Sequence, residues 1–180
     1  MKEIKRDDCK PDDLSKFKVF VGGPIQHAVM SHGFKSDVQH LIETCISTLT
    51  ADGHTIFSAH VAERFGELTE TFTPKSIWQR DRKWMGECDL FVAVLPSDGT
   101  GALLRTDGTC IELGWASALK KPIIVMTERF DCIVASDLFR GIIFNGVAQH
   151  IDLAEFAQCP SLLSECASQI LGNKLRVATG

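Results

Sequence analysis

Two short and nearly continuous apolar runs constrain the fold of this chain more than any other feature. They are residues 89–95 (DLFVAVL) and residues 122–126 (PIIVM). A strand without polar alternation is typical of a parallel sheet that helices cover on both faces. Between the runs, residues 110–119 have the pattern of a helix, and adjacent parallel strands need such a crossover connection. The two runs therefore predict a strand–helix–strand unit.

The same alternation extends along the rest of the chain. An apolar run at residues 18–21 ends in Gly-Gly-Pro, which is typical of a strand followed by a turn. Apolar side chains then recur at helical or strand spacing. They predict a helix at 38–49, a strand at 55–59, a helix at 74–86, a candidate fifth strand at 142–144 and a last helix at 151–171. We predict an α/β fold, a single doubly wound domain with a mostly parallel five-stranded sheet, flavodoxin- or Rossmann-like.

Length and charge limit the organisation and the partners. A chain of 180 residues suits one such domain. We expect residues 1–16, which are charged and lack an apolar core, to form a polar leader ahead of a domain at 17–180. The formal net charge of −4 offers no basic field to a nucleic-acid backbone. No apolar run is long enough to span a bilayer. We therefore expect a small-molecule partner and neither nucleic acid nor membrane.

The cysteines indicate a reducing compartment. There are seven, an odd number, and none forms a CxxC pair. This pattern supports neither a zinc ribbon nor a disulfide framework. Reduced thiols in a cytoplasmic protein are the better interpretation.

The most promising carboxylate is Glu112, in the segment GTCIELGWA. Ligands of doubly wound sheets bind beyond the carboxyl ends of the strands. We expect Glu112 to lie there, in the first turn of a helix whose backbone amides keep it ionised. An ionised carboxylate is what attack at an anomeric carbon requires. From spacing alone, a charge that only favours the helix dipole is the better-supported interpretation.

Two other polar side chains are candidates. Asp81 shares a predicted helix face with Trp78 and Met85, and an acid on an apolar stripe is unusual enough to suggest a function. His60 directly follows a predicted strand, where it could donate to a ligand or serve only the structure.

Two turns are candidates for binding an anion. Gly22-Gly23-Pro24 follows the first strand, but it is not the GxGxxG pattern of dinucleotide sites. Residues 106–109 precede a helix N-terminus, where anions commonly bind. Taken alone, each is more often a tight turn that binds nothing.

Taken together, these segments resemble the nucleoside 2-deoxyribosyltransferase superfamily. Within it, the chain is most similar to the nucleoside 5′-monophosphate N-glycoside hydrolases, which include 2′-deoxynucleoside 5′-phosphate N-hydrolase and CMP hydrolases. The resemblance covers about residues 17–141. It rests on VFVGGPI (19–25), AHVAERFG (59–66), the spacing from Asp81 to Asp89, and GTCIELGWASALKKPIIV (108–125).

The resemblance implies a role for each matching residue. Glu112 corresponds to the nucleophile and Asp81 to the carboxylate that orients it or assists protonation of the base. His60 corresponds to a histidine at the mouth of the site, and Gly23 and Ile25 to residues that line the pocket. The implied mechanism is retaining, through a glycosyl-enzyme intermediate, with no metal and no organic cofactor.

One position bears on the 5′-phosphate. Relatives that act on nucleosides have an aspartate six residues before the nucleophile, whereas the monophosphate hydrolases have a serine. Thr106 resembles the second class, so we expect Thr106 and the amides near Gly108 to bind a phosphate. Ser136 resembles a serine that reaches a neighbouring subunit's phosphate, which implies a homodimer with sites shared across the interface.

The pocket also departs from the family pattern. Gln26 stands where the hydrolases carry an arginine, and Phe20 stands where one of them has a tyrosine. An extra stretch at about residues 97–104 lengthens the loop before the nucleophile. We still expect Phe20 and Gln26 to contact the substrate.

Three functions follow in order of support. The first is hydrolysis of a nucleoside 5′-monophosphate, CMP-like or purine, to free base and (deoxy)ribose 5-phosphate. The second is transfer of deoxyribose between bases. It differs from hydrolysis in having an aspartate at the position of Thr106 and in excluding water from the intermediate. The third is a nucleotide-binding sensor without turnover, which would not need a nucleophile; no motif suits a flavin module.

Overall fold

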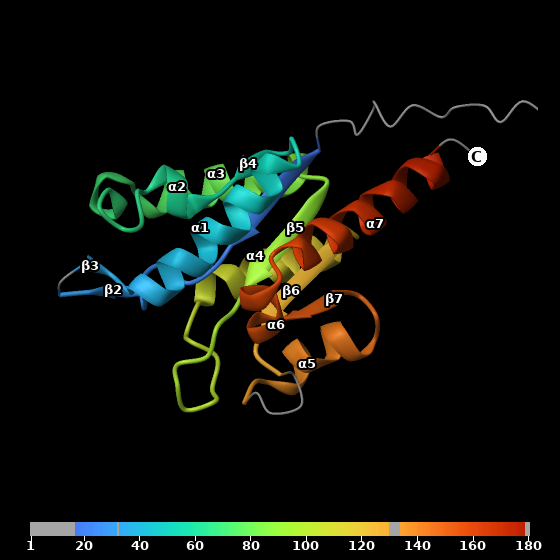
Figure 1. Cartoon of the computed structure of the whole chain (residues 1–180). Coiled ribbons are helices and arrows are strands. Elements are labelled where there is room, and N and C mark those ends of the chain that lie inside the picture. Colours follow the sequence, from blue (N-terminus) through green and yellow to red (C-terminus); the bar gives the residue numbers. More distant parts are fainter. Residues whose placement is uncertain (1–16, 32, 130–133, 179–180) are drawn as a thin grey trace, which may run out of the picture.

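Five parallel strands form the centre of the molecule (Figure 1). The computed structural model describes residues 17–31, 33–129 and 134–178, so the expected leader at 1–16 lies outside the described residues. Every neighbouring pair in the sheet is parallel, which confirms the predicted α/β class. The order is β4-β1-β5-β6-β7, with bounds β1 Lys18–Gly22, β4 Thr55–Phe57, β5 Leu90–Val94, β6 Ile123–Thr127 and β7 Gln149–Asp152. This is the flavodoxin-like order, in which the chain reverses its direction of winding between β1 and β5.

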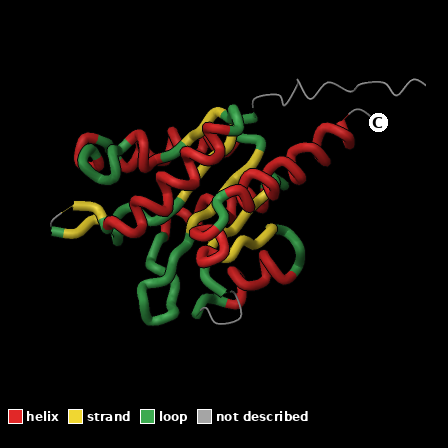
Figure 2. The backbone as a smooth tube through the Cα atoms, viewed as in Figure 1, coloured by secondary structure: helices red, strands yellow, loops and turns green. Residues whose placement is uncertain are grey.

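Helices cover both faces of the sheet (Figure 2). All five residues of β5 and of β6 are buried, as the apolar runs predict. Their side chains alternate between two hydrophobic clusters, one on each face. One cluster packs against α1 (Ser36–Ala51), α6 (Leu153–Gln158) and α7 (Ser161–Ala178), and the other against α3 (Pro74–Glu87), α4 (Asp107–Ala118) and α5 (Asp137–Phe144).

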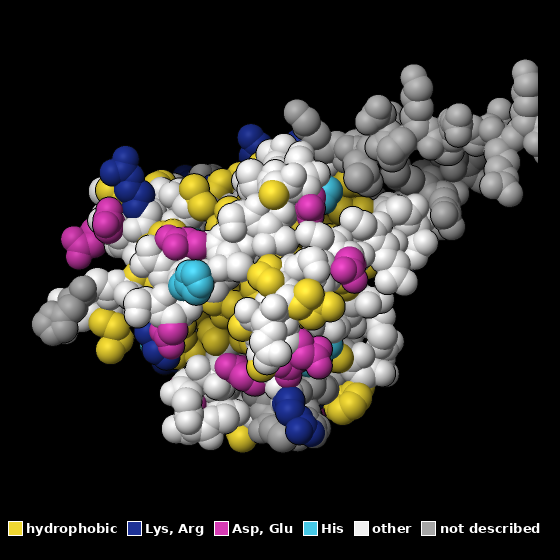
Figure 3. Space-filling model, viewed as in Figure 1, with side chains coloured by type: hydrophobic (Ala, Val, Ile, Leu, Met, Phe, Trp, Pro, Cys, Tyr) yellow, Lys and Arg dark blue, Asp and Glu magenta, His cyan; other side chains and the backbone are white. Residues whose placement is uncertain are grey.

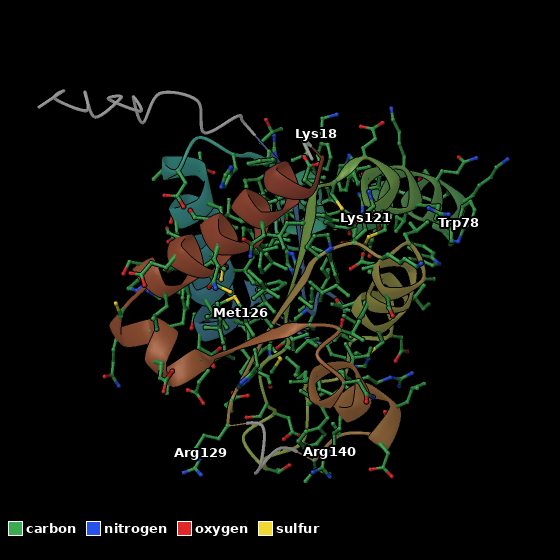
Figure 4. The ribbon with its side chains drawn as sticks, turned by 90° about the vertical axis from the view of Figure 1, so that its right-hand side faces the viewer. Lys18, Trp78, Lys121, Met126, Arg129 and Arg140 are labelled. Carbon is green, nitrogen blue, oxygen red and sulfur yellow. The ribbon has the colours of Figure 1, made fainter. Side chains whose placement is uncertain are left out.

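Local contacts fix the two ends of α3. Thr73 caps its start: its side chain accepts from the Ser76 amide, and Ser76 reciprocates as in a capping box, with Pro74 as the first helical residue. At the other end, Nζ of Lys121 donates to the carbonyls of Gly86 at 2.8 Å and Cys88 at 2.7 Å (Figure 4). These bonds tie α3 to the turn before β6.

The C-terminal third differs from the prediction. Residues 142–144 are helical, in α5, and the fifth strand is β7. The reason is that Ser136 caps a helix in which Phe139, Ile142 and Ile143 reach the core at helical spacing. A short apolar run does not distinguish a strand from a buried helix. The single helix expected at 151–171 is β7, α6 and α7, because Asp152 caps α6 and Pro160 separates the helices.

Short elements surround the carboxyl end of β1. The predicted strand at 55–59 ends at Phe57, and α2 (Ala59–Ala62) begins directly after it. A hairpin of β2 (Val29–Met30) and β3 (Gly33–Phe34) and the 3₁₀ turn η1 (Thr69–Thr71) were not predicted. Among the described helices, none combines the length and the apolar content that crossing a membrane requires.

We expect α7 to be an integral part of the core. Leu163 of α7 is fully buried, whereas 84% of Leu138 on α5 is exposed. Leu163→Ala should therefore lower the free energy of unfolding by about 2–5 kcal/mol, and the matched control Leu138→Ala by less than about 0.5 kcal/mol. Urea denaturation measures both. Equal effects of the two substitutions would contradict this packing.

Candidate active site

A cavity of about 180 Å³ lies at the carboxyl end of the sheet, beside β1 and the start of α4. This is the reversal point of the winding order, where ligands of such folds bind. The cavity brings together eight of the residues singled out in the sequence: Gly23, Ile25, Gln26, His60, Asp81, Thr106, Gly108 and Glu112.

Glu112 lies deep in this cavity, with 7% of the residue exposed. The α4 helix begins at Asp107, three residues earlier than predicted, so Glu112 is in the second turn and not the first. Its side chain reaches the end of β1: a Cβ added to Gly22 would lie 2.5 Å from Oε2 of Glu112. Only glycine permits this approach.

The surroundings of Glu112 do not favour its charge. Burial raises the pKa of Glu112 well above its usual value, the negative charge of Asp81 raises it further, and Arg80 opposes both. The expectation that helix amides keep Glu112 ionised was therefore wrong, because those amides lie one turn away. Within the described residues, no hydrogen bond to this carboxylate is present. Its oxygens are thus available to a ligand.

Asp81 is buried on the inner face of α3 and is held by its sequence neighbour. Nε of Arg80 donates to Oδ1 of Asp81 at 2.7 Å, and a terminal nitrogen of Arg80 donates to Oδ2 at 3.3 Å. Burial raises the pKa of Asp81, while the hydrogen bond and the charge of Arg80 oppose that rise. Asp81 and Glu112 are therefore two carboxylates of raised pKa in one cavity, an arrangement suited to acid–base chemistry.

The sequence did not single out Glu63 or Arg80. Glu63, which follows α2, is 2% exposed and also lines the cavity. Its Oε1 accepts from the same Arg80 nitrogen at 2.7 Å, and its Oε2 accepts from the Thr69 hydroxyl at 2.8 Å. An arginine next to Asp81 was the one available signal, because a buried carboxylate commonly has a cationic partner.

His60 forms part of the wall and not the mouth of the cavity. It is fully buried, and its Nε2 lies 3.1 Å from the carbonyl of Pro24. Burial lowers the pKa of His60 to about 4, so the ring is neutral at pH 7 and donates from Nε2 to that carbonyl. His60 thereby fixes the turn after β1, against which Gly23 packs: a Cβ there would lie 3.3 Å from Cε1 of His60.

The opposite end of the cavity is formed by the N-terminus of α4. Thr106 is the N-cap, and its side chain makes no capping bond but donates to the Thr109 hydroxyl at 2.7 Å. The amides of the first turn, including that of Gly108, have no partner within the helix. These amides and the helix dipole favour an anion.

Two predicted site residues lie outside the cavity. Phe20 is fully buried and packs edge-on against Trp84 and Phe91, with ring centroids 5.7 and 5.3 Å away. It does not line the cavity, because its place in β1 turns it toward the α3–α4 layer of the core. Ser136 is exposed and caps α5, accepting from the Phe139 amide at 3.3 Å. Its expected role involves a second subunit.

A larger cavity of about 310 Å³ lies between α1 and α6, on the face of the sheet that α1, α6 and α7 cover. Apolar side chains gather in a hollow on that face (Figure 3). It contains none of the predicted site residues. No group of three or more His, Cys, Asp or Glu side chains in the described ranges could hold a metal ion.

The comparisons with solved structures agree with this fold. The Clostridium botulinum CMP N-glycosidase BcmB is similar at 25% identity and a TM-score of 0.55, with 81% of this chain and 98% of that chain covered. BlsM, known from a solution structure, has 24% identity and a TM-score of 0.58, with 86% and 94% covered. A conserved protein from Enterococcus faecalis V583 has 15% identity and a TM-score of 0.54, with 80% and 99% covered.

No curated protein sequence matches the chain. The family model of nucleoside 2-deoxyribosyltransferase matches residues 29–154. This range includes Asp81, Thr106 and Glu112, and it covers more than half of the chain. On this match, together with the fold, the chain belongs to the nucleoside 2-deoxyribosyltransferase family.

Proposed function

We propose that the protein hydrolyses the N-glycosidic bond of a nucleoside 5′-monophosphate, releasing the free base and (deoxy)ribose 5-phosphate. The arrangement of α4 carries this proposal. The helix presents Glu112 at the depth of the cavity and open amides beside Thr106 at its N-terminus. Six residues of helix separate them by about 9 Å along the axis, room for a sugar between a nucleophile and a bound 5′-phosphate.

The reaction follows from these positions. An oxygen of Glu112 attacks C1′ as the bond from C1′ to the base nitrogen breaks, which gives a glycosyl ester and a base that takes up a proton. Asp81, whose pKa is also raised, is placed to supply that proton or to orient Glu112. Water then attacks C1′: its oxygen replaces Glu112 on the sugar, its proton returns to Asp81 where Asp81 protonated the base, and the sugar phosphate and the Glu112 carboxylate are released. Nucleotide and water are consumed in equal number.

The substrate class is supported by the anion site and by one relative. An uncharged Thr106 at the helix N-terminus accepts a phosphate, whereas an aspartate would repel it. A neighbour at 25% identity is described as a CMP N-glycosidase. Transfer of deoxyribose to a second base remains the alternative, and the experiments below include an acceptor base to detect it.

The assembly belongs to the same proposal. Ser136 is exposed at the start of α5 and lies outside the cavity of its own chain. We infer a homodimer in which Ser136 completes the partner's phosphate site, and a cytoplasmic location in which Cys45, Cys88, Cys110, Cys159 and Cys166 are free thiols.

Glu112→Gln should lower kcat by at least about 1,000-fold, because the amide cannot form the glycosyl ester.

In the wild type, kcat/KM should fall as the pH drops through the raised pKa of Glu112, because the ionised form attacks. The acid limb should thus lie above pH 4.5, the usual glutamate value. Liberated base is measured by chromatography across a panel of ribo- and deoxyribonucleoside monophosphates.

A 2-fluoro sugar substrate tests whether Glu112 or Asp81 is the nucleophile, because it traps the glycosyl-enzyme intermediate. It should add its sugar mass to a peptide that contains Glu112. Near neutral pH, Glu112→Gln should also have a larger free energy of unfolding than the wild type. The raised pKa of Glu112 makes its ionised form destabilising as the pH rises, and the amide removes that effect. Near wild-type turnover of the variant, or a label on Asp81, would show that the assigned roles are wrong.

Thr106→Asp should lower kcat/KM for a monophosphate by about 100-fold, through repulsion and loss of a hydroxyl contact. Thr106→Ser keeps the hydroxyl and is the matched control, which should retain activity. The measurement compares each monophosphate with its nucleoside, with and without an acceptor base. Equal kcat/KM for nucleotide and nucleoside in the wild type would refute the phosphate site, and base exchange that outpaces hydrolysis would favour the transferase.

Mixed dimers test the role of Ser136. Glu112→Ala and Ser136→Asp should each be nearly inactive alone. A mixture that has exchanged subunits should recover about a quarter of wild-type activity, because half of the dimers would contain one intact site. Light scattering establishes the dimer. An active monomer, or no recovery in a verified mixed dimer, would exclude a shared site.

A further inference from the structure

The charged side chains buried beside Glu112 form one network with an excess of acid. Glu63 is 2% exposed, and Asp81 and Glu112 are each 7% exposed. The single cation among these groups is Arg80, which is partly buried, with 15% of its side chain exposed. With all four groups ionised, the network would carry two uncompensated negative charges. Buried charge without a partner is strongly unfavourable, so the placement of Arg80 decides which carboxylate is compensated.

Arg80 is held in one orientation. One terminal nitrogen donates both to Oε1 of Glu63 at 2.7 Å and to Oδ2 of Asp81 at 3.3 Å. The guanidinium carbon lies 5.4 Å from the Phe72 ring centroid and 4.9 Å from that of Trp84. The Thr69 hydroxyl fixes the second oxygen of Glu63. Arg80 therefore forms ion pairs with Glu63 and Asp81 and acts on Glu112 only through space.

We propose that Glu63 and Arg80 are positioning residues that set, from opposite directions, the pH range in which Glu112 is the ionised nucleophile. This role rests on the proposed function of Glu112. Neither residue is assigned to touch the reacting atoms. Glu63 keeps Arg80 away from Glu112 and adds a negative charge, while Arg80 supplies the positive charge that limits the repulsion between the carboxylates.

The other charged groups around the cavity do not replace this pair. His60 is neutral at pH 7, since burial lowers its pKa to about 4. Arg105 and Asp107 pair with each other at 2.8 Å in solvent. His27 is exposed at the rim. Solvent screens exposed charges more than buried ones, so Glu63, Arg80 and Asp81 dominate the field at Glu112.

The two halves of the ion pair predict opposite effects. The charge of Glu63 raises the pKa of Glu112 and Asp81, and the charge of Arg80 lowers both. Glu63→Gln should therefore move the titration of Glu112 to lower pH, and Arg80→Gln should move it to higher pH. A salt bridge that served only the structure would give both variants the same loss of stability and leave the titration in place.

The experiment reads the titration in two independent ways. Carboxyl ¹³C NMR of the full-length protein follows Glu112, whose signal Glu112→Gln identifies, and kcat/KM for a nucleoside monophosphate is measured against pH. We expect displacements on the order of one pH unit, downward for Glu63→Gln and upward for Arg80→Gln, in both readouts. Glu63→Asp keeps the charge, so Glu112 should titrate at the same pH as in the wild type. Glu87→Gln removes an exposed ion pair on the same helix α3 and should leave it unchanged.

Each outcome decides a different claim. Shifts in the same direction, or no shift, in the two charge-removing variants would overturn the inference. If Arg80→Gln does not fold, the titration of Glu112 in Glu63→Gln is compared with that in Glu63→Asp. Only Glu63→Gln loses the charge, so only that variant should show the downward shift. If the wild type releases no base from any monophosphate, the proposed function fails, while the NMR titration still tests the inference.

Discussion

The close approach of Glu112 to Gly22 is the contact on which the site depends. It joins the end of β1 to the second turn of α4 across the point where the winding reverses. A side chain at residue 22 would fill the position of the carboxylate. The contact also requires α4 to lie close to the sheet, which buried Leu113 and Ala116 permit on the inner face of the helix. Close helix–sheet packing thus places an acid in the cavity at the carboxyl end of the sheet, where ligands of such folds bind.

This placement has an energetic consequence. A catalytic carboxylate in solvent would retain an ordinary pKa, whereas Glu112 is buried beside a second acid and has a raised one. Ionised Glu112 is therefore destabilising in the empty protein. A sugar that develops positive charge at C1′ would relieve that cost only in the transition state, which is the condition for catalysis. The instability of the empty site and its proposed reactivity have the same origin.

The sequence predicted most of the sheet, and eight of the ten predicted site residues line one cavity. The run at 89–95 identified a buried strand because parallel strands covered on both faces are nearly continuously apolar, and because the run alternates along the chain with helical segments. Residues 142–144 gave the wrong element because a short apolar run lacks a period. The position of Glu112 along its helix was wrong because the predicted helix began at Cys110, whereas α4 begins at Asp107, directly after its N-cap Thr106. Glu63 was missed because its partner Arg80 lies 17 residues away and meets it only in the fold.

Residues 97–104, which we expected to lengthen the loop before Glu112, are tied to neighbouring parts of the fold. Glu128, just after β6, accepts from the Ser97 amide through both oxygens, at 2.9 and 2.8 Å. Ala102 forms a parallel bridge with Val134, two residues before Ser136. This segment thereby connects the end of β5 to the residues that enter α5. Since Val134 and Leu138 are both largely exposed around Ser136, the same segment carries the apolar surface that a second subunit would cover. The contacts of residues 97–104 therefore reach both the end of β6 and the segment that enters α5, where Ser136 caps the helix.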